Sequence, residues 1–376
     1  MSRMISRFRR GLLCLVATIL VGSGCHDHGQ SDVLQHACSY LWSQQGEDGG
    51  WHSSTHGILQ GGVALTPFIT WHLMQAVSGT NQPPRGSLQR ALDFIRQTLE
   101  DEEGQPLVLE YPNYAAAYAL RVMHHYGVPA DTQYVHQLQG YLIKQQFTRQ
   151  RGIDEDHPAF GGWGFGETGL PPGQAGHVDI SHTRRILQAL SDVLPAEHPV
   201  FTHAMIYLQR HQNFVSAGHP GNHHDGGFFT SMHTAYTNKS RQYATDPPRW
   251  ESYATATADG LLGWLALRRT HDARVQAAVN WLEEHDAISH VEGIPEEDPA
   301  QWHLVMRYYH LAVRSEALSA VGCRGPWCLQ VKQLLTNEQL PDGSFVNPLG
   351  APNKEDDPLL ATTLAVVALQ QLSVPP

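Results

Sequence analysis

Two loops of the sequence carry histidines beside carboxylates. They are the segments HVDISH at residues 177–182 and HHDGG at residues 223–227. Imidazole and carboxylate groups together can transfer protons or bind a transition metal. The candidate catalytic residues are Asp179, His182 and Asp225, and the candidate ligands of a divalent metal are His223 and His224. The identity of any cofactor stays open.

Two of these residues also have an ordinary structural explanation. Asp179 stands directly before an apolar helical stretch, where an aspartate side chain caps the helix N-terminus. Asp225 precedes two glycines, a setting typical of a tight turn. The histidines can equally be solvated loop residues. The position of the two segments in space decides between these explanations.

The N-terminus has the layout of a secretory signal. Four arginines precede an apolar run over residues 11–21, which ends in small residues and Cys25. The run is much shorter than the roughly 20 residues of a membrane-spanning helix. The segment VGSGC resembles a bacterial lipobox, although Gly22 stands where leucine is usual. We predict a signal peptide over residues 1–24, lipidation of Cys25, a tether over residues 25–31, and a lipid anchor in a membrane of the cell envelope, on the periplasmic or cell-surface side. A plain cleaved signal and a membrane-retained one are the alternatives.

Charge and cysteine content limit the possible partners. The net charge is −11 and is spread along the chain, with no basic stripe that could hold phosphates, so we expect no nucleic acid partner. In an oxidising compartment Cys323 and Cys328 are close enough in sequence to form a small disulfide loop, with Cys38 as a buried free thiol. The sequence leaves open whether that disulfide forms.

The helices that must position these loops come in pairs. Six times an amphipathic stretch leads through a polar, glycine-bearing loop into a second stretch that is richer in alanine, leucine and aromatic residues. Such a period is typical of repeated helical hairpins, and a helix covered on nearly every side needs that second composition. We predict an all-α fold, an (α/α)6 toroid of about six helical hairpins with an outer and an inner ring. It forms a single domain over residues 32–376, with a long insert at about 213–252 whose aromatic and basic residues favour a lid.

The repeats resemble a known family. YLWSQQGEDGGW at residues 40–51 is similar to the QW motif of squalene-hopene and oxidosqualene cyclases, and weaker copies end in FGGW, DGGFF and DGSF. The chain thus resembles the repeat family of terpenoid cyclases and protein prenyltransferase β subunits, as an uncharacterised bacterial lipoprotein branch. The resemblance implies that a glutamine ties each outer helix to a neighbouring helix terminus while the tryptophan packs nearby. These structural residues are Gln44 with Trp51 and Gln145 with Trp163, with Gln45 and Gln146 as the alternative glutamines.

The catalytic residues of that family are missing. In the cyclases an aspartate of a DxDD motif protonates an alkene, but Ser181 falls on that position here, so Asp225 or Asp259 would have to replace it. Protein prenyltransferases hold zinc with an Asp-x-Cys pair, which this sequence lacks. We therefore expect no prenyltransferase α subunit as a partner. Whether the protein is an enzyme stays open.

The leading hypothesis is a toroid that binds an apolar or extended ligand, such as an isoprenoid, a lipid or a glycan, in its central cavity. The candidate ligand-binding residues are Tyr253, Trp264, Trp302 and Tyr309. Alternatively these aromatics only fill the ring, or the scaffold hosts a polysaccharide lyase, a glycosidase or a divergent terpene cyclase. Loops that lead into adjacent inner helices should share one mouth of the ring. We therefore predict one rim from residues 177–182 and 223–225, which binds a metal or, at the helix N-terminus, an anion.

Overall fold

The computed structural model describes residues 28–77, 81–101, 111–167, 169–214 and 224–373. In this part of the chain the outer helices are α1 (His28–Ser43), α3 (Ser87–Asp101), α5 (Thr132–Gln145), α7 (Pro199–His211), α9 (Ala273–Glu284) and α12 (Pro326–Glu338). The inner helices are α2 (Leu65–Gln75), α4 (Pro112–Tyr126), α6 (Ile180–Val193), α8 (Ala254–Ala266), α11 (Arg307–Ala320) and α13 (Pro358–Ser373). The signal peptide, Cys25 and His223 lie outside the described residues. Of the predicted tether, residues 28–31 are described and already belong to α1.

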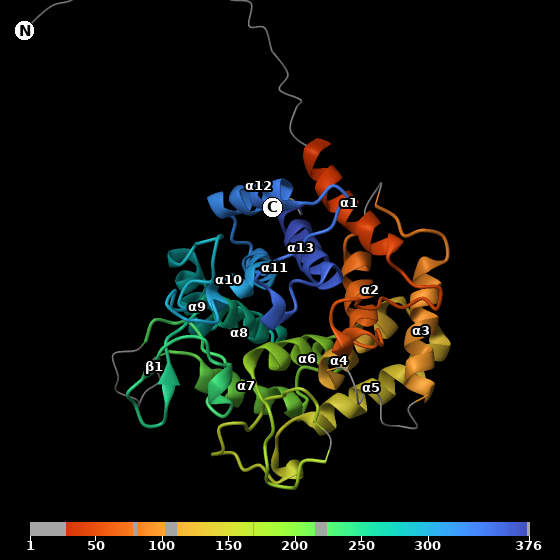
Figure 1. Ribbon diagram of the computed structural model, residues 1–376. Helices are drawn as coiled ribbons and strands as arrows, with labels where there is room; N and C mark the ends of the chain where they lie inside the picture. Colours follow the sequence, from red (N-terminus) through yellow and green to blue (C-terminus); the bar gives the residue numbers. More distant parts are fainter. Residues whose placement is uncertain (1–27, 78–80, 102–110, 168, 215–223, 374–376) are drawn as a thin grey trace, which may run out of the picture.

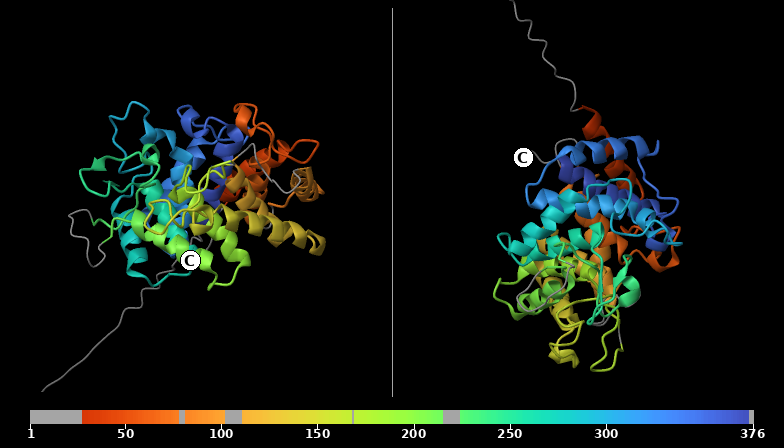
Figure 2. Two further views of the ribbon diagram at one scale, coloured as in Figure 1. Left: turned by 90° about the horizontal axis from the view of Figure 1, so that it is seen from below. Right: turned by 90° about the vertical axis from the view of Figure 1, so that its left-hand side faces the viewer.

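The inner helices form a closed ring. Each one packs against the next in chain order, and α13 packs against α2, so the ring closes between its last and first members (Figure 1). The outer helix α1 contacts both α12 and α13. Figure 2 shows the same neighbourhood from two further sides, with the red first helix beside the blue last helices. The predicted all-α toroid of six hairpins is therefore confirmed.

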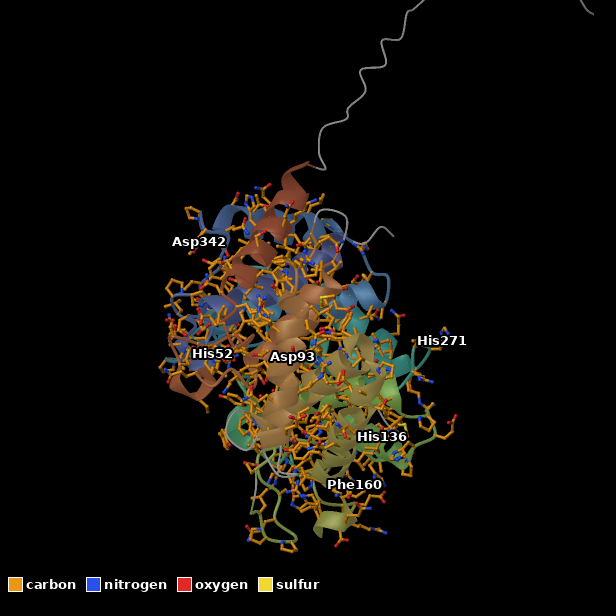
Figure 3. All side chains as sticks on the ribbon, turned by 90° about the vertical axis from the view of Figure 1, so that its right-hand side faces the viewer. His52, Asp93, His136, Phe160, His271 and Asp342 are labelled. Atoms are coloured by element: carbon orange, nitrogen blue, oxygen red, sulfur yellow. The ribbon has the colours of Figure 1, made fainter. Side chains whose placement is uncertain are left out.

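Outer and inner helices differ in composition because they are covered differently. In the outer helix α3, Leu92 and Ile95 are buried while Asp93 is exposed to solvent on the outside of the molecule (Figure 3). The inner helix α8 is buried from Ala254 through Trp264. The first pattern is that of a helix with one apolar face, and the second that of a helix enclosed by neighbours.

Four loops share one set of hydrogen bonds that joins neighbouring hairpins. In each, the side-chain amide of a glutamine donates to a glycine carbonyl of its own loop and to a carbonyl near the start of another outer helix. Gln146 donates to Gly161 at 2.9 Å and to Val200 of α7 at 3.0 Å. The glutamines are Gln45, Gln146, Gln212 and Gln339, and their outer-helix acceptors are Ser87, Val200, Arg274 and Val33. Since Val33 belongs to α1, the last of these contacts helps to close the outer ring.

The glutamines that make these contacts lie one position later than the predicted Gln44 and Gln145. Gln44 is exposed and donates only to the adjacent Ser43, whereas Gln45 reaches Gly49 and Ser87. Gln145 is the last residue of α5 and its side chain accepts from Arg151 at 3.3 Å. Gln146 directly follows the last residue of α5, and Gln45 is the second residue after α1. The glutamines that reach the loop carbonyls thus both lie beyond the helix end, and they replace Gln44 and Gln145.

In two of these loops a tryptophan fixes the loop to both of its helices. Trp51 is fully buried, its Nε1 donates to the Leu41 carbonyl of α1 at 2.6 Å, and its backbone N–H donates to Thr66 of α2 at 3.0 Å. Trp163 repeats this arrangement with Leu142 and Thr183. The aromatic ring thus packs between an outer and an inner helix, while a threonine hydroxyl holds its backbone.

The insert after α7 carries the only strands of the described residues. The strands β1 (Gln242–Tyr243) and β2 (Arg249–Trp250) form an antiparallel pair. Before them, the chain passes over the start of α6, where Thr234 accepts from the backbone of Val178 at 3.0 Å and Ile180 donates to the carbonyl of Thr230 at 3.1 Å. The short helix α10 (Trp302–Val305) lies directly before α11.

The described cysteines are all free thiols. Cys38 is buried, as predicted, while Cys323 and Cys328 are not joined, so the disulfide alternative does not hold in this structure. The Cys323 thiol instead donates to Glu283 at 2.8 Å. Among the described helices, none combines the length and the apolar character required to span a bilayer.

Candidate functional site

A cavity of about 380 Å³ lies at the N-terminal ends of the inner helices. All six inner helices contribute to its wall, and their lining residues include Phe68, Tyr114, Ser181, Asp259, Tyr309 and Leu364. Most of the wall is apolar or aromatic. Its volume is at the lower end of the roughly 300–1,000 Å³ typical of small-molecule sites.

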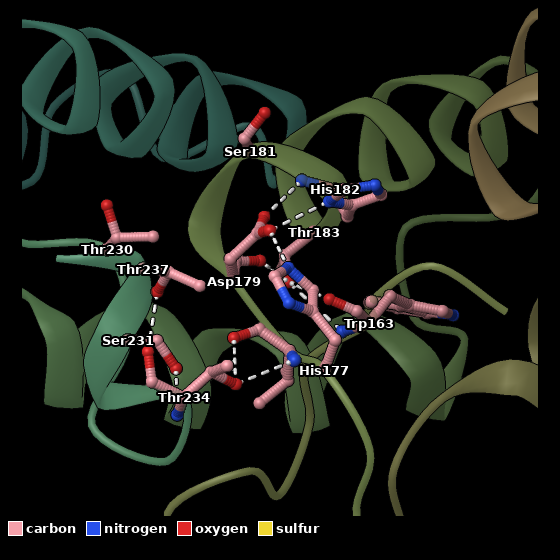
Figure 4. Close-up of polar contacts among 12 residues, drawn as sticks. Trp163, His177, Asp179, Ser181, His182, Thr183, Thr230, Ser231, Thr234 and Thr237 are labelled. Atoms are coloured by element: carbon pink, nitrogen blue, oxygen red, sulfur yellow. Dashed lines mark hydrogen bonds and ion pairs between the residues drawn. The ribbon is translucent and has the colours of Figure 1, made fainter. Parts of the chain in front are cut away.

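Two histidines and one aspartate meet on one side of the cavity, and we call them the histidine cluster. Asp179 lies between His177 and His182 (Figure 4). The Nε2 of His177 and the Nδ1 of His182 both contact Oδ2 of Asp179, the second at 2.8 Å. All three residues are more than nine-tenths buried, and all three line the cavity.

Local backbone geometry fixes the histidine cluster. Asp179 is the N-cap of α6, and its Oδ1 accepts from the backbone N–H of His182 at 2.7 Å. The predicted capping role is therefore confirmed. The ring of His177 stacks on Phe165, with centroids 3.9 Å apart, and its backbone N–H donates to Glu167. One carboxylate thus caps a helix and orients two imidazole rings.

The two histidines of the cluster favour the ionised form of Asp179. Burial by itself raises the pKa of this carboxyl, but His182 and His177 outweigh burial and hold the pKa well below its ordinary value. A carboxylate that already occupies the N-terminus of α6 leaves no place there for a second anion. The anion site that we predicted at this helix end is therefore wrong.

Hydrogen bonding in the histidine cluster is incomplete. The Nε2 atom of His182 is buried and has no hydrogen-bond partner in the described part of the chain. The Nδ1 atom of His177 has only a long contact to the hydroxyl of Tyr236, at 3.5 Å. The His182 ring borders the cavity between Tyr114 and Phe165. A buried polar atom without a partner costs about 1–3 kcal/mol, so a water or a polar ligand atom at this nitrogen would be favourable.

The next turn of α6 carries a second buried polar group, the arginine cluster. Asp259 of α8 accepts from Arg184 at 3.0 Å, from Arg185 at 3.4 Å and from the Tyr309 hydroxyl at 2.6 Å. The same hydroxyl accepts from Arg185 at 3.0 Å and lies 2.9 Å from Ser181. Every side-chain oxygen of Asp259, Tyr309 and Ser181 therefore has a partner. Nε of Arg185 has none, but the guanidinium lies over the rings of Tyr114 and Tyr309.

The second predicted loop does not join the histidine cluster. Asp225 is exposed, and its carboxylate accepts from Gly227 at 3.0 Å and from Ser252 at 2.7 Å. The turn packs against α9, because a side chain on Gly226 would meet Ala277. Neither Asp225 nor His224 lines the cavity. The predicted common rim is therefore not formed by these two residues, and Asp225 has the turn role that was the alternative.

Three of the four predicted ligand-binding aromatics do line the cavity. They are Tyr253, Trp302 and Tyr309. Trp264 does not line the cavity. It is fully buried near the C-terminal end of α8, where its Nε1 donates to Gln212 at 3.1 Å. Trp264 is thus a core residue that supports the glutamine of the fourth hairpin.

Sequence reasoning missed the two arginines of the arginine cluster. Arg184 and Arg185 are less than 5% exposed. The available signal was two consecutive arginines inside a helix expected to be covered on every side, because a fully buried arginine requires an acidic or aromatic partner. Their partner Asp259 follows about 75 residues later in the chain.

The histidine cluster is also the one group of metal-ligand type in the described residues. Its three candidate ligand atoms lie within 4.8 Å of one another. In this geometry, however, both nitrogens approach the same carboxylate oxygen at hydrogen-bond distance, and the other oxygen caps α6. A metal would have to displace both contacts. The atoms present are thus arranged as a hydrogen-bonded group.

Comparison with known proteins defines the fold class. No known family model matches the chain, and no curated protein matches it by sequence. An α-1,6-mannanase of Salegentibacter sp. HEL1_6 is similar in structure, with a TM-score of 0.56 and 10% identity over 91% of this chain and 98% of that one. An unsaturated glucuronyl hydrolase specific for heparin has a TM-score of 0.55 and 14% identity over 93% and 98% of the two chains.

A third similar structure belongs to the class that the sequence resembled. The type II terpene cyclase MstE from Scytonema has a TM-score of 0.51 and 13% identity, covering 91% of this chain and 97% of that one. All three are α/α toroids. At these identities the likeness establishes the fold and no activity. The chain is an α/α toroid of the kind found in terpene cyclases and in two sorts of glycan hydrolase.

Proposed function

We propose that the protein binds an extended, largely apolar ligand in the central cavity. The observation that carries this proposal is the cavity wall, to which all six inner helices contribute mainly apolar and aromatic side chains. A ligand that fills it removes apolar surface from water, which gains about 25 cal/mol per Å². The unpartnered nitrogen of His182 supplies one polar contact within this wall.

The lining favours an isoprenoid or a lipid over a glycan. A variant of the terpene cyclase MstE binds merosterolic acid A, and the mannanase variant binds α-1,6-mannotriose. A glycan presents hydroxyl groups on every side and needs many polar partners. The two acidic groups of the cavity are not free for this role, because they are already occupied by histidines, arginines and Tyr309.

Because these polar groups are already hydrogen-bonded to one another, they are poorly placed to act as the acid or base of a lyase, a glycosidase or a cyclase. Tyr309 beside Arg185 has the residue types of a lyase pair, but its hydroxyl already donates to Asp259, and burial raises its pKa. Ser181, on the position of the cyclase acid, contacts Tyr309. Both groups are parts of a closed network, so ligand binding is the better supported function.

Mass spectrometry of a lipid extract from purified protein tests the proposal. We expect a co-purifying apolar compound from the wild type. The Leu360→Trp variant fills the cavity that Leu360 lines and should lose this compound. The matched Leu349→Trp variant changes an exposed leucine outside the cavity and should keep it. An empty extract from the wild type, or equal recovery from both variants, would contradict ligand binding in this cavity.

We further propose that the toroid is exported and held at a membrane surface through a lipid on Cys25. The support is the signal-like N-terminus and the VGSGC segment of the sequence. Metabolic labelling with a fatty acid should mark the wild type and leave the Cys25→Ser variant unmarked and soluble. A variant that stays in the membrane without label would show that the apolar run is itself the anchor.

A further inference from the structure

Two lysines stand at the mouth of the cavity. Lys239 comes from the insert before β1, and Lys354 from the loop before α13, and both are partly exposed cavity-lining residues. The lining residue Tyr236, 76% exposed, marks the same opening. Two cations from distant parts of the chain thus border one opening in a protein of net charge −11.

Aromatic side chains hold both ammonium groups at this opening. Nζ of Lys239 lies 3.9 Å from the ring centroid of Trp302, and Nζ of Lys354 lies 5.4 Å from that of Tyr111. Both rings also line the cavity. A cation over an aromatic face is attracted by the ring quadrupole, so these contacts keep the charges beside the cavity.

The backbone of Lys354 is fixed as well. Its φ of +63° is in the left-handed region, which costs energy for a residue other than glycine. The following residue, Glu355, is fully buried and accepts from the backbone N–H groups of Tyr308 and Tyr309 at the start of α11. Lys354 is the C-cap of the short helix Ala351–Asn353, so its backbone is held in place beside the start of α11.

Neither lysine forms a salt bridge within the described residues, where the nearby acids have other partners. Glu297 pairs with Arg241, and Asp356 pairs with His56. Asp298 attracts Lys239 from a distance, but its carboxylate accepts from the backbone of Ala300. Burial also lowers the pKa of Lys239, with Asp298 acting in the opposite direction. An anion would therefore find two cations without an acidic competitor.

Deeper in the cavity, the charges are already balanced. Asp179 contacts two histidines, and Asp259 contacts Arg184 and Arg185. The unbalanced positive charge is thus confined to the mouth, above an apolar interior. A ligand that matches both parts has an apolar chain and one anionic end.

We propose that the ligand is an anionic amphiphile whose carboxylate or phosphate binds Lys239 and Lys354 while its apolar chain fills the cavity. This inference rests on the proposed apolar-ligand function and specifies its chemical class. The anion forms charge-assisted hydrogen bonds with the two ammonium groups, which are stronger than bonds between neutral groups.

Isothermal titration calorimetry of the folded toroid at low ionic strength tests the inference. The probes are dodecanoate, dodecyl phosphate, 1-dodecanol and inorganic phosphate. We expect each anionic amphiphile to bind about tenfold or more tighter than the alcohol, and salt to weaken this preference. Inorganic phosphate should bind at least about tenfold more weakly than dodecyl phosphate.

Variants assign the preference to the two lysines. The Lys239→Met, Lys354→Met variant keeps the apolar stems and should bind the amphiphiles as weakly as the alcohol. Lys332→Met, on α12 and outside the cavity, is the matched control and should behave as the wild type. A double variant that retains the preference, or a wild type without one, would overturn the anionic class. Inorganic phosphate binding as tightly as dodecyl phosphate would also overturn it, in favour of a free-anion site. Failure of the alcohol and both amphiphiles to bind would instead overturn the apolar-ligand function itself.

Discussion

The histidine cluster and the arginine cluster share the start of α6 and the same cavity, but they differ in the atom that is left without a partner. In the arginine cluster, both carboxylate oxygens of Asp259 and the Tyr309 hydroxyl are bonded to protein groups. In the histidine cluster, one carboxylate oxygen serves two imidazole rings, and Nε2 of His182 has no partner.

Buried polar groups can stabilise the fold or bind a ligand, and this difference indicates which role each cluster has. A network in which each member satisfies the others stabilises the fold and leaves little for a ligand. Arg185 Nε also lacks a partner, but its guanidinium lies over the rings of Tyr114 and Tyr309 and does not line the cavity. His182 does line the cavity, so a ligand atom that pairs with its Nε2 recovers the cost of an unpaired buried atom. We therefore assign the arginine cluster to the stability of the inner ring, and the histidine cluster to the ligand.

The strongest test of this assignment removes the acid of the arginine cluster. Asp259→Ala leaves Arg184 and Arg185 buried without this carboxylate, and breaking a buried ion pair in this way costs about 3–5 kcal/mol. Urea unfolding followed by circular dichroism should show this loss. The control Asp156→Ala, at an exposed loop position, should change the unfolding free energy by less than about 0.5 kcal/mol. A loss below about 1 kcal/mol for Asp259→Ala would mean that the cluster is not a stabilising network.

A smaller effect is expected from Asp179→Asn, which keeps an N-cap residue and removes the charge between the histidines. We expect a loss of about 1–3 kcal/mol near neutral pH, because one imidazole N–H loses its acceptor. The folded-state pKa of Asp179 lies below its unfolded value of about 3.9. Its ionised form therefore contributes stability above that value and loses it as pH falls below it. The difference between wild type and variant should shrink as the pH falls below about 4.

Zinc provides the control for this prediction. If the histidine cluster is a hydrogen-bonded group, added Zn²⁺ should leave the melting temperature of the wild type unchanged. A rise that Asp179→Asn abolishes would identify the cluster as a metal centre, because a metal that binds only the folded state stabilises it. A pH-independent difference between wild type and variant would contradict the charged role of Asp179.

The sequence predicted the ring much better than it predicted the site, for physical reasons. The six hairpins follow from helical periodicity and from glutamine-glycine-aromatic loops, which are local signals. The glutamines were misplaced by one residue because a helix end cannot be located more closely from sequence. Asp179 and His182 were found together because they lie within one turn, and the cap fixes their separation.

The non-local part of the site was beyond the sequence. The pairing of Arg184 with Asp259, and of Asp259 with Tyr309, joins three inner helices and depends on which side of each helix faces the cavity. Asp225 is not a rim residue, because its carboxylate accepts hydrogen bonds from Gly227 and Ser252 of its own turn and insert. The order of the hairpins predicted which loops are neighbours, but not the direction of this side chain.

The smallest and most specific effect separates ligand contact from stability. His182→Asn places an amide near the former Nδ1, so the bond to Asp179 can persist while the unpartnered Nε2 is removed. If a ligand hydroxyl pairs with Nε2, ω-hydroxydodecanoate should bind the wild type about fivefold tighter than dodecanoate, equivalent to one net hydrogen bond of about 1 kcal/mol. His182→Asn should abolish this ratio and change the unfolding free energy by less than about 1 kcal/mol. The matched variant Tyr309→Phe should keep the ratio but lose about 1–3 kcal/mol of stability, since Ser181, Arg185 and Asp259 lose a partner. Calorimetry with the two probes and urea unfolding of both variants measure these four quantities. A ratio that survives in His182→Asn and disappears in Tyr309→Phe would reverse the assignment of the two clusters.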